Sequence, residues 1–132
     1  MLIEAEDYWL LALQGEPINR VSLDWQVHLH SYDHPAEVEI AISCPFRLVL
    51  GGEVHEVLPG RLETLAPVLR VFRKPVASVV AQKDGHLEVR FSDGDRLTVA
   101  PHPHDDAWEL GLTPGVRIVC LPGGEVTALR VG

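Results

Sequence analysis

Apolar and polar residues alternate with a period of two along most of the chain, which predicts β-strands with one buried face. The clearest run places apolar residues at the odd positions of 21–29, and it predicts one half-buried strand or two strands joined by a tight turn. The same parity places Trp25 in the core. The apolar run 8–13 is ambiguous between a strand and a helical turn. Further strands are expected over 38–42, 46–50, 53–58, 76–82, 86–91, 95–100, 107–112, 116–121 and 126–131.

Turn residues separate these strands. The pairs Asp-Gly at 84–85 and 93–94 lie between alternating apolar runs, which is the strongest short-range sign of a hairpin. A Gly-Gly pair at 51–52 and two proline-glycine turns mark further chain reversals. The second half is therefore expected to be a meander of antiparallel strands.

One segment has a helical spacing instead. Between 61 and 72 the large apolar residues form a helical stripe of Leu62, Leu65, Leu69 and Phe72. A proline inside a helix costs about 3 kcal/mol, so Pro67 predicts either a short helix that begins near it or two helical turns with a break. The strand order of the first half faintly repeats in the second. These patterns predict an α+β fold: mostly antiparallel β meanders, in two related halves, with one short helix near 61–72.

The length of 132 residues fits one domain over 1–132, with roughly two-thirds of its surface buried. Cys44 and Cys120 have no second cysteine pair at zinc-site spacing, so both are expected to be buried, reduced thiols. The segment 1–7 carries acids where a signal peptide has positive charge, and no uncharged run exceeds 8 residues. We expect a cytoplasmic protein without a membrane span.

The net charge of −8 is unevenly distributed. Residues 1–60 contain ten acidic residues and two arginines, whereas 61–132 contain nine acidic and nine basic residues. An acidic half repels phosphate backbones, which argues against nucleic-acid binding. It either attracts a basic protein partner or only keeps the chain soluble.

Trp9 lies beside Asp7 in this acidic half, and it is either packed in the core or exposed. An exposed aromatic ring surrounded by acids is a common anchor for a protein partner. The candidate protein-binding residues are Asp7, Trp9, Glu37, Glu39, Glu53 and Glu56.

Two histidine clusters have metal-ligand chemistry. His28 and His30 share one face of a strand, and the loop around Pro103 holds the imidazoles and carboxylate of His102, His104 and Asp105. Each cluster is alternatively a solvated polar surface. A small-ligand or metal-binding protein is therefore the alternative function, although no cofactor is required by the sequence.

Motifs for catalysis are missing. The chain has no Gly-x-Ser-x-Gly elbow, phosphate-binding glycine loop or His-Glu-x-x-His motif, and Cys44 has no neighbouring base. We expect no enzyme.

The second half carries three turn-rich motifs: DGxLxVxFSDGxxLxV over 84–99, DAWEL over 106–110 and IVCLPGG over 118–124. This pattern resembles a family of small bacterial domains of unknown function that is common in actinobacteria. It is also similar in general form to immunity proteins that neutralise polymorphic toxins. The likeness is good from residue 76 onward and loose before it, and it supplies no catalytic residues. It implies an immunity-like role without catalysis. Together with the acidic first half, which favours a basic protein partner, it leads us to expect a non-catalytic protein-binding module that is a monomer or homodimer.

Overall fold

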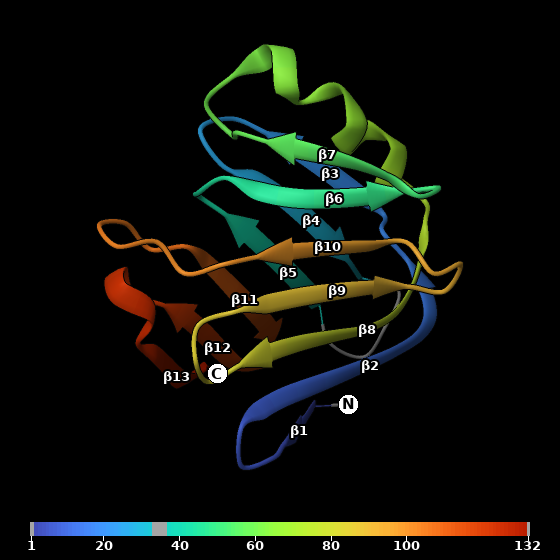
Figure 1. Ribbon diagram of the computed structural model, residues 1–132. Coiled ribbons are helices and arrows are strands. Elements are labelled where there is room, and N and C mark those ends of the chain that lie inside the picture. Colours follow the sequence, from blue (N-terminus) through green and yellow to red (C-terminus); the bar gives the residue numbers. More distant parts are fainter. Residues whose placement is uncertain (1, 33–36, 132) are drawn as a thin grey trace.

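The computed structural model describes residues 2–32 and 37–131, which fold into two antiparallel β-sheets that lie one in front of the other (Figure 1). The strands are β1 (Leu2–Glu4), β2 (Tyr8–Pro17), β3 (Arg20–Leu23), β4 (Val27–Ser31), β5 (Glu37–Ile42), β6 (Phe46–Leu50), β7 (Glu53–Val57), β8 (Pro75–Gln82), β9 (Leu87–Phe91), β10 (Arg96–Val99), β11 (Trp108–Thr113), β12 (Gly115–Cys120) and β13 (Val126–Val131). One sheet has the order β1-β2-β8-β9-β10-β6-β7 and the other β13-β12-β11-β5-β4-β3. A mainly β sandwich therefore replaces the expected α+β fold.

The core lies between the sheets because the period-two alternation gives each strand one apolar face. In β4, for example, Val27 and Leu29 are fully buried, whereas His28 and His30 lie on the outer face. The inward side chains of both sheets join one hydrophobic cluster. Among the described residues, no helix has the length and apolar character needed to cross a membrane.

The predicted helical segment exists as two 3₁₀ helices, η1 (Leu62–Thr64) and η2 (Ala66–Val71), with Pro67 in the first turn of η2. The expectation of two helical turns with a break is confirmed. The predicted stripe is wrong, because a 3₁₀ helix has three residues per turn and buries every third residue. The buried side chains are Leu65, Val68 and Val71, and the exposed ones are Leu62, Leu69 and Phe72.

The two halves of the chain do not form separate layers, which corrects the prediction of two related halves. Strands β2, β6 and β7 of the first half pair in one sheet with β8–β10, and β3–β5 pair in the other sheet with β11–β13. Each sheet is thus assembled from both halves, because long-range strand pairing and not local similarity decides the neighbours.

The run 21–29 forms two strands joined by a tight turn, and the ambiguous run 8–13 lies in strand β2. Trp25 is in the turn between β3 and β4, so its parity with the strand residues has no structural meaning. It is 82 % exposed, which corrects its predicted place in the core. The turn is closed by Asp24, whose Oδ1 accepts a hydrogen bond of 2.6 Å from the backbone N–H of Gln26.

The turn between β8 and β9 ties the two sheets together. The carbonyl oxygen of Gly85 accepts a hydrogen bond of 2.8 Å from the buried indole N–H of Trp108, and the Cys120 thiol lies 3.5 Å from the same oxygen. Gly85 lies in a turn that joins two strands of the seven-stranded sheet, whereas Trp108 and Cys120 lie in strands of the other sheet. One of the predicted Asp-Gly turns is therefore also an inter-sheet contact.

Candidate functional site

The strongest cluster of chemically active side chains lies on the outer face of the six-stranded sheet. His28 and His30 are two residues apart on β4, so both point away from the core. Glu39 on the neighbouring strand β5 is directly opposite His30 in the register. The imidazoles are mostly covered, with side chains 19 % and 14 % exposed, whereas the carboxylate is 40 % exposed.

One Glu39 oxygen, Oε2, lies between the two rings. It is 3.0 Å from Nδ1 of His28 and 3.6 Å from Nε2 of His30. The rings are nearly parallel, with an angle of 18° and centroids 6.4 Å apart. One ligand atom from each of the three residues lies within 4.8 Å of the other two.

The second nitrogen of each ring faces a further carboxylate. Nε2 of His28 is 3.6 Å from Oδ1 of Asp24, and Nδ1 of His30 is 3.7 Å from Oε1 of Glu37. In the described part of the chain, no Lys or Arg nitrogen lies within 4 Å of these three carboxylates. Two imidazoles and one carboxylate form a donor set that zinc and other divalent transition metals accept.

The other predicted metal cluster is organised differently. Nδ1 of His102 accepts hydrogen bonds of 3.1 Å from the backbone N–H groups of both His104 and Asp105. This nitrogen therefore closes the loop and is not free to bind a metal. Within the residues that the structure describes, the loop does not join the group of His28, His30 and Glu39.

Comparison with family models identifies a match over residues 9–130, to a family of unknown function, DUF6188. The chain belongs to this family. No curated protein and no solved structure matches it significantly.

In this DUF6188 chain, the predicted protein-binding residues do not form one surface. Glu37 and Glu39 lie on the outer face of the six-stranded sheet, beside the histidines. Glu53 and Glu56 lie on β7, at one edge of the other sheet, where Glu56 pairs with Arg47 at 2.8 Å. The acidic first half is thus distributed over different parts of the sandwich.

Trp9 is not an exposed anchor, because only 8 % of it is accessible. Its ring packs into the core, and the Lys83 ammonium lies 4.8 Å from the ring centroid. Lys83 also binds Glu4 at 2.7 Å, and this hydrogen bond lowers the pKa of the Glu4 carboxyl. Asp7 is exposed in the connection between β1 and β2.

The exposed tryptophan is Trp25, which the alternation pattern misplaced. The signal that could have found it is Asp24, an acid that favours a turn at this point of the sequence. Six of the ten large apolar side chains that are exposed in the described residues belong to β3, the β3–β4 turn, β7, η1, η2 or the residue that follows η2: Leu23, Trp25, Val54, Leu62, Leu69 and Phe72. In Figure 1 the helices η1 and η2 cover the end of the sandwich at which β7 and β3 are located.

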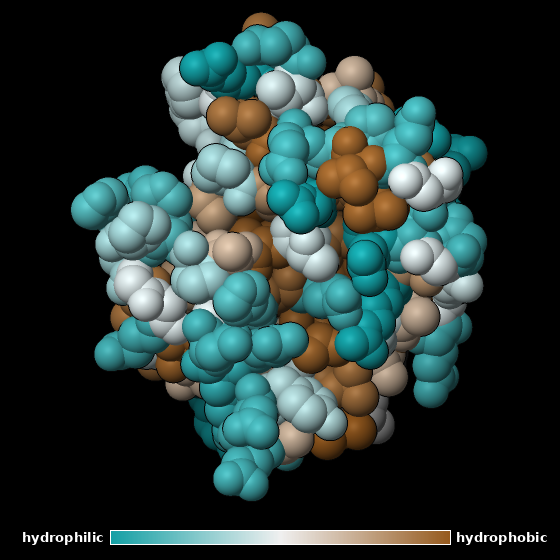
Figure 2. Space-filling model, viewed as in Figure 1, coloured by the Kyte–Doolittle hydropathy of each residue, from teal (hydrophilic) through white to brown (hydrophobic). Residues whose placement is uncertain are grey.

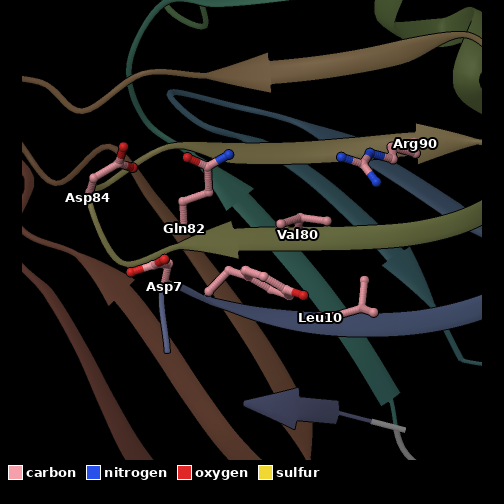
Figure 3. A pocket seen from close by; sticks show the side chains of 7 residues that line it. Asp7, Leu10, Val80, Gln82, Asp84 and Arg90 are labelled. Atoms are coloured by element: carbon pink, nitrogen blue, oxygen red, sulfur yellow. The ribbon is translucent and has the colours of Figure 1, made fainter. Parts of the chain in front are cut away.

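The outer face of the seven-stranded sheet has a shallow depression of about 460 Å³. Figure 2 shows hydrophobic surface between hydrophilic residues on this face. Figure 3 shows Asp7 and Asp84 at one end of the depression and Arg90 at the other. Asp84 is already bonded to His86, and Arg90 pairs with Glu88, so the lining does not gather free catalytic groups.

The two cysteines are buried and free, as predicted. Burial raises the pKa of the Cys44 thiol to about 11, and burial also raises the pKa of Cys120. A nucleophilic cysteine needs a lowered pKa, so neither thiol has the properties of a catalytic group.

Proposed function

We propose that this domain is a non-catalytic protein-binding module, that its partner is a basic protein, and that Trp25 is the anchor of the interface. The observation that carries the proposal is the exposure of Trp25, 82 %, at the end of the sandwich that holds most of the exposed apolar side chains. Aromatic side chains that become buried at the centre of an interface supply much of its binding free energy.

The chain around Trp25 is ordered by specific contacts. The backbone N–H of Gln26 donates a hydrogen bond to Oδ1 of Asp24, which closes the turn. The side-chain amide of Gln26 donates a hydrogen bond of 2.5 Å to Oγ of Ser43. A Cβ atom placed on Gly60 would lie 3.6 Å from two carbons of the indole ring. The turn that carries Trp25 is therefore ordered before binding, and an ordered turn loses less conformational entropy on binding than a mobile one.

The charge of the sheet that leads away from the β3–β4 turn supports a basic partner. Over the described residues of β3, β4, β5 and the β3–β4 turn, the carboxylates of Asp24, Glu37 and Glu39 are opposed by Arg20 alone. A basic segment that extends from the anchor along the outer face of β4 and β5 would meet this field, which increases the association rate and excludes acidic competitors. Binding should therefore weaken as salt screens the charges.

An immunity-like role is a specific form of this proposal. In that role the basic partner is a toxin, and binding blocks it without chemistry on the domain. Its support is the resemblance in the turn motifs of the second half. Co-expression of the domain with the retained partner tests it, because an immunity protein restores growth that the partner alone inhibits.

The test uses the full chain as immobilised bait in lysate of its own host, followed by quantitative mass spectrometry of the retained proteins. We expect one basic protein to be retained at about 1:1 by the wild type and released by higher salt. With that protein purified, Trp25→Ala should raise Kd by about 30-fold, the effect of an interface hot spot of about 2 kcal/mol. Leu129→Ala removes another exposed apolar side chain, on β13, and should leave Kd unchanged.

The same experiment can contradict the proposal. Trp25→Ala removes an exposed side chain, so its melting temperature should equal that of the wild type and any loss of binding is not a folding defect. If the wild type and Trp25→Ala retain the same proteins from the lysate, Trp25 is not the anchor of the interface. If the affinity of the complex does not change with salt concentration, the proposal of a basic partner is wrong.

A further inference from the structure

We propose that His28, His30 and Glu39 bind one Zn²⁺ ion on the outer face of the six-stranded sheet. This metal site goes beyond the proposed protein-binding function and does not depend on it. It rests on the convergence of three donor groups from two adjacent strands, β4 and β5.

The distances are close to those of a zinc site. Donor atoms bound to tetrahedral zinc at 2.0–2.1 Å are about 3.3 Å from one another. Here Oε2 of Glu39 is 3.0 Å from Nδ1 of His28 and 3.6 Å from Nε2 of His30, and no pair in the group exceeds 4.8 Å. Small side-chain rotations bring the three atoms into the coordination sphere, because the two strands already hold their backbones in register.

The surroundings of the two rings provide a second, independent observation. A histidine that binds metal through one nitrogen usually presents the other to a carboxylate or carbonyl, which orients the ring and increases its basicity. Nε2 of His28 faces Asp24 and Nδ1 of His30 faces Glu37, at 3.6 and 3.7 Å. Both rings thus have their inner nitrogen toward Glu39 and their outer nitrogen toward a different carboxylate.

Electrostatics also favours a cation at this position. Asp24, Glu37 and Glu39 surround two imidazoles, and no Lys or Arg of the described chain pairs with them. Imidazole nitrogens select a transition metal over Ca²⁺ or Mg²⁺, which take oxygen ligands. Three protein ligands leave the fourth zinc position open to water.

The experiment is calorimetric titration of the full chain, first stripped of metal with a chelator, with Zn²⁺ alone. We expect a stoichiometry of one, and loss of that binding in both His28→Gln and Glu39→Gln. Asp24→Asn keeps an oxygen that can close the turn but removes the negative charge beside His28, and it should weaken zinc binding by about 10–100-fold. Substitution with Co²⁺ should give the visible absorption bands of a tetrahedral site in the wild type.

The control is the double variant His102→Gln/His104→Gln, which alters the other histidine cluster and should bind zinc like the wild type. Far-UV circular dichroism without metal shows whether each variant is folded. The Co²⁺ spectrum of the wild type tests the site even if a variant of a metal ligand does not fold. A wild type that binds no Zn²⁺, or binding that survives His28→Gln and disappears in the double variant, would overturn the proposal. Trp25→Ala should not affect zinc binding, so failure of this proposal is separate from failure of the protein-binding one.

Discussion

The two Asp-Gly turns provide a matched pair for testing how the sheets are joined. Gly85 and Gly94 follow aspartates in equivalent hairpin turns, and their φ angles are +105° and +95°. They differ in surroundings: a Cβ on Gly85 would lie 3.0 Å from the Cα and O of Gly124 and from Cβ of Pro101, whereas a Cβ on Gly94 would have no atom within 4 Å. We therefore compare Gly85→Ala with Gly94→Ala.

The magnitudes follow from this difference. Positive φ in an L-residue costs about 1–2 kcal/mol, and both variants carry this strain. Gly85→Ala must in addition displace the backbone at Gly124, and crowding of this kind costs about 1–3 kcal/mol. We expect a loss of about 1–2 kcal/mol for Gly94→Ala and of about 2–5 kcal/mol for Gly85→Ala. The larger loss includes disturbance of the hydrogen bond from Trp108 to the Gly85 carbonyl.

The assay is urea unfolding at equilibrium, followed by far-UV circular dichroism. With a slope of about 2 kcal/mol per molar, the extra 1–3 kcal/mol places the midpoint of Gly85→Ala about 0.5–1.5 M below that of Gly94→Ala. The comparison is valid if both slopes equal that of the wild type. Equal midpoints would refute the reasoning, since they would mean that the contact with Gly124 is not present or yields without cost.

Two further predictions concern titratable groups. Nζ of Lys74 is 2.5 Å from Asp93 and 2.8 Å from Asp95, and its hydrogen bonds lower the pKa of both carboxyls below the ordinary 3.8. Carboxyls whose pKa is lowered in the folded state stabilise the protein above their unfolded pKa, and this effect is lost as pH falls through the folded pKa. The loss of unfolding free energy caused by Lys74→Met should therefore be full near about pH 6 and shrink below about pH 4. Urea unfolding across this range measures that loss, and a loss that does not change with pH contradicts the prediction. Because burial raises the pKa values of Cys44 and Cys120, neither thiol should react with iodoacetamide in the folded protein near about pH 8, whereas both should react in denaturant. Intact-mass measurement follows the labelling, and fast modification of the folded chain would show that a thiol is accessible.

Local patterns predicted most of the strands but not every side chain's place. The alternation in 38–42 and 46–50 and the Asp-Gly pairs correspond to observed strands and turns. Trp25 was misplaced because parity assumes an unbroken strand, and Asp24 closes a turn there. The stripe over 61–72 failed because a 3₁₀ helix with a period of three takes the place of an α-helix.

The sequence predicted two of the three residues of the candidate metal site as metal ligands. The spacing of His28 and His30 places them on one face of a strand, whatever that strand pairs with. Glu39 was assigned to protein binding, and its position opposite His30 depends on the register of β4 and β5. The second histidine cluster has the same ligand types in its sequence, but Nδ1 of His102 already accepts hydrogen bonds from two backbone N–H groups.

Local sequence patterns were enough to predict that the chain is β-rich and where most strands and turns lie. They also show that the two cysteines have no zinc-site spacing and that the negative charge is concentrated in residues 1–60. These properties depend on residues close together along the chain. Only the folded chain shows that both halves contribute to each sheet, that Trp9 is buried and Trp25 exposed, and that Glu39 lies beside the two histidines. Strand pairing joins backbone groups from distant segments through hydrogen bonds that are much the same for all residue types. The choice of neighbours is therefore made by the packing of the whole core, which no local pattern contains.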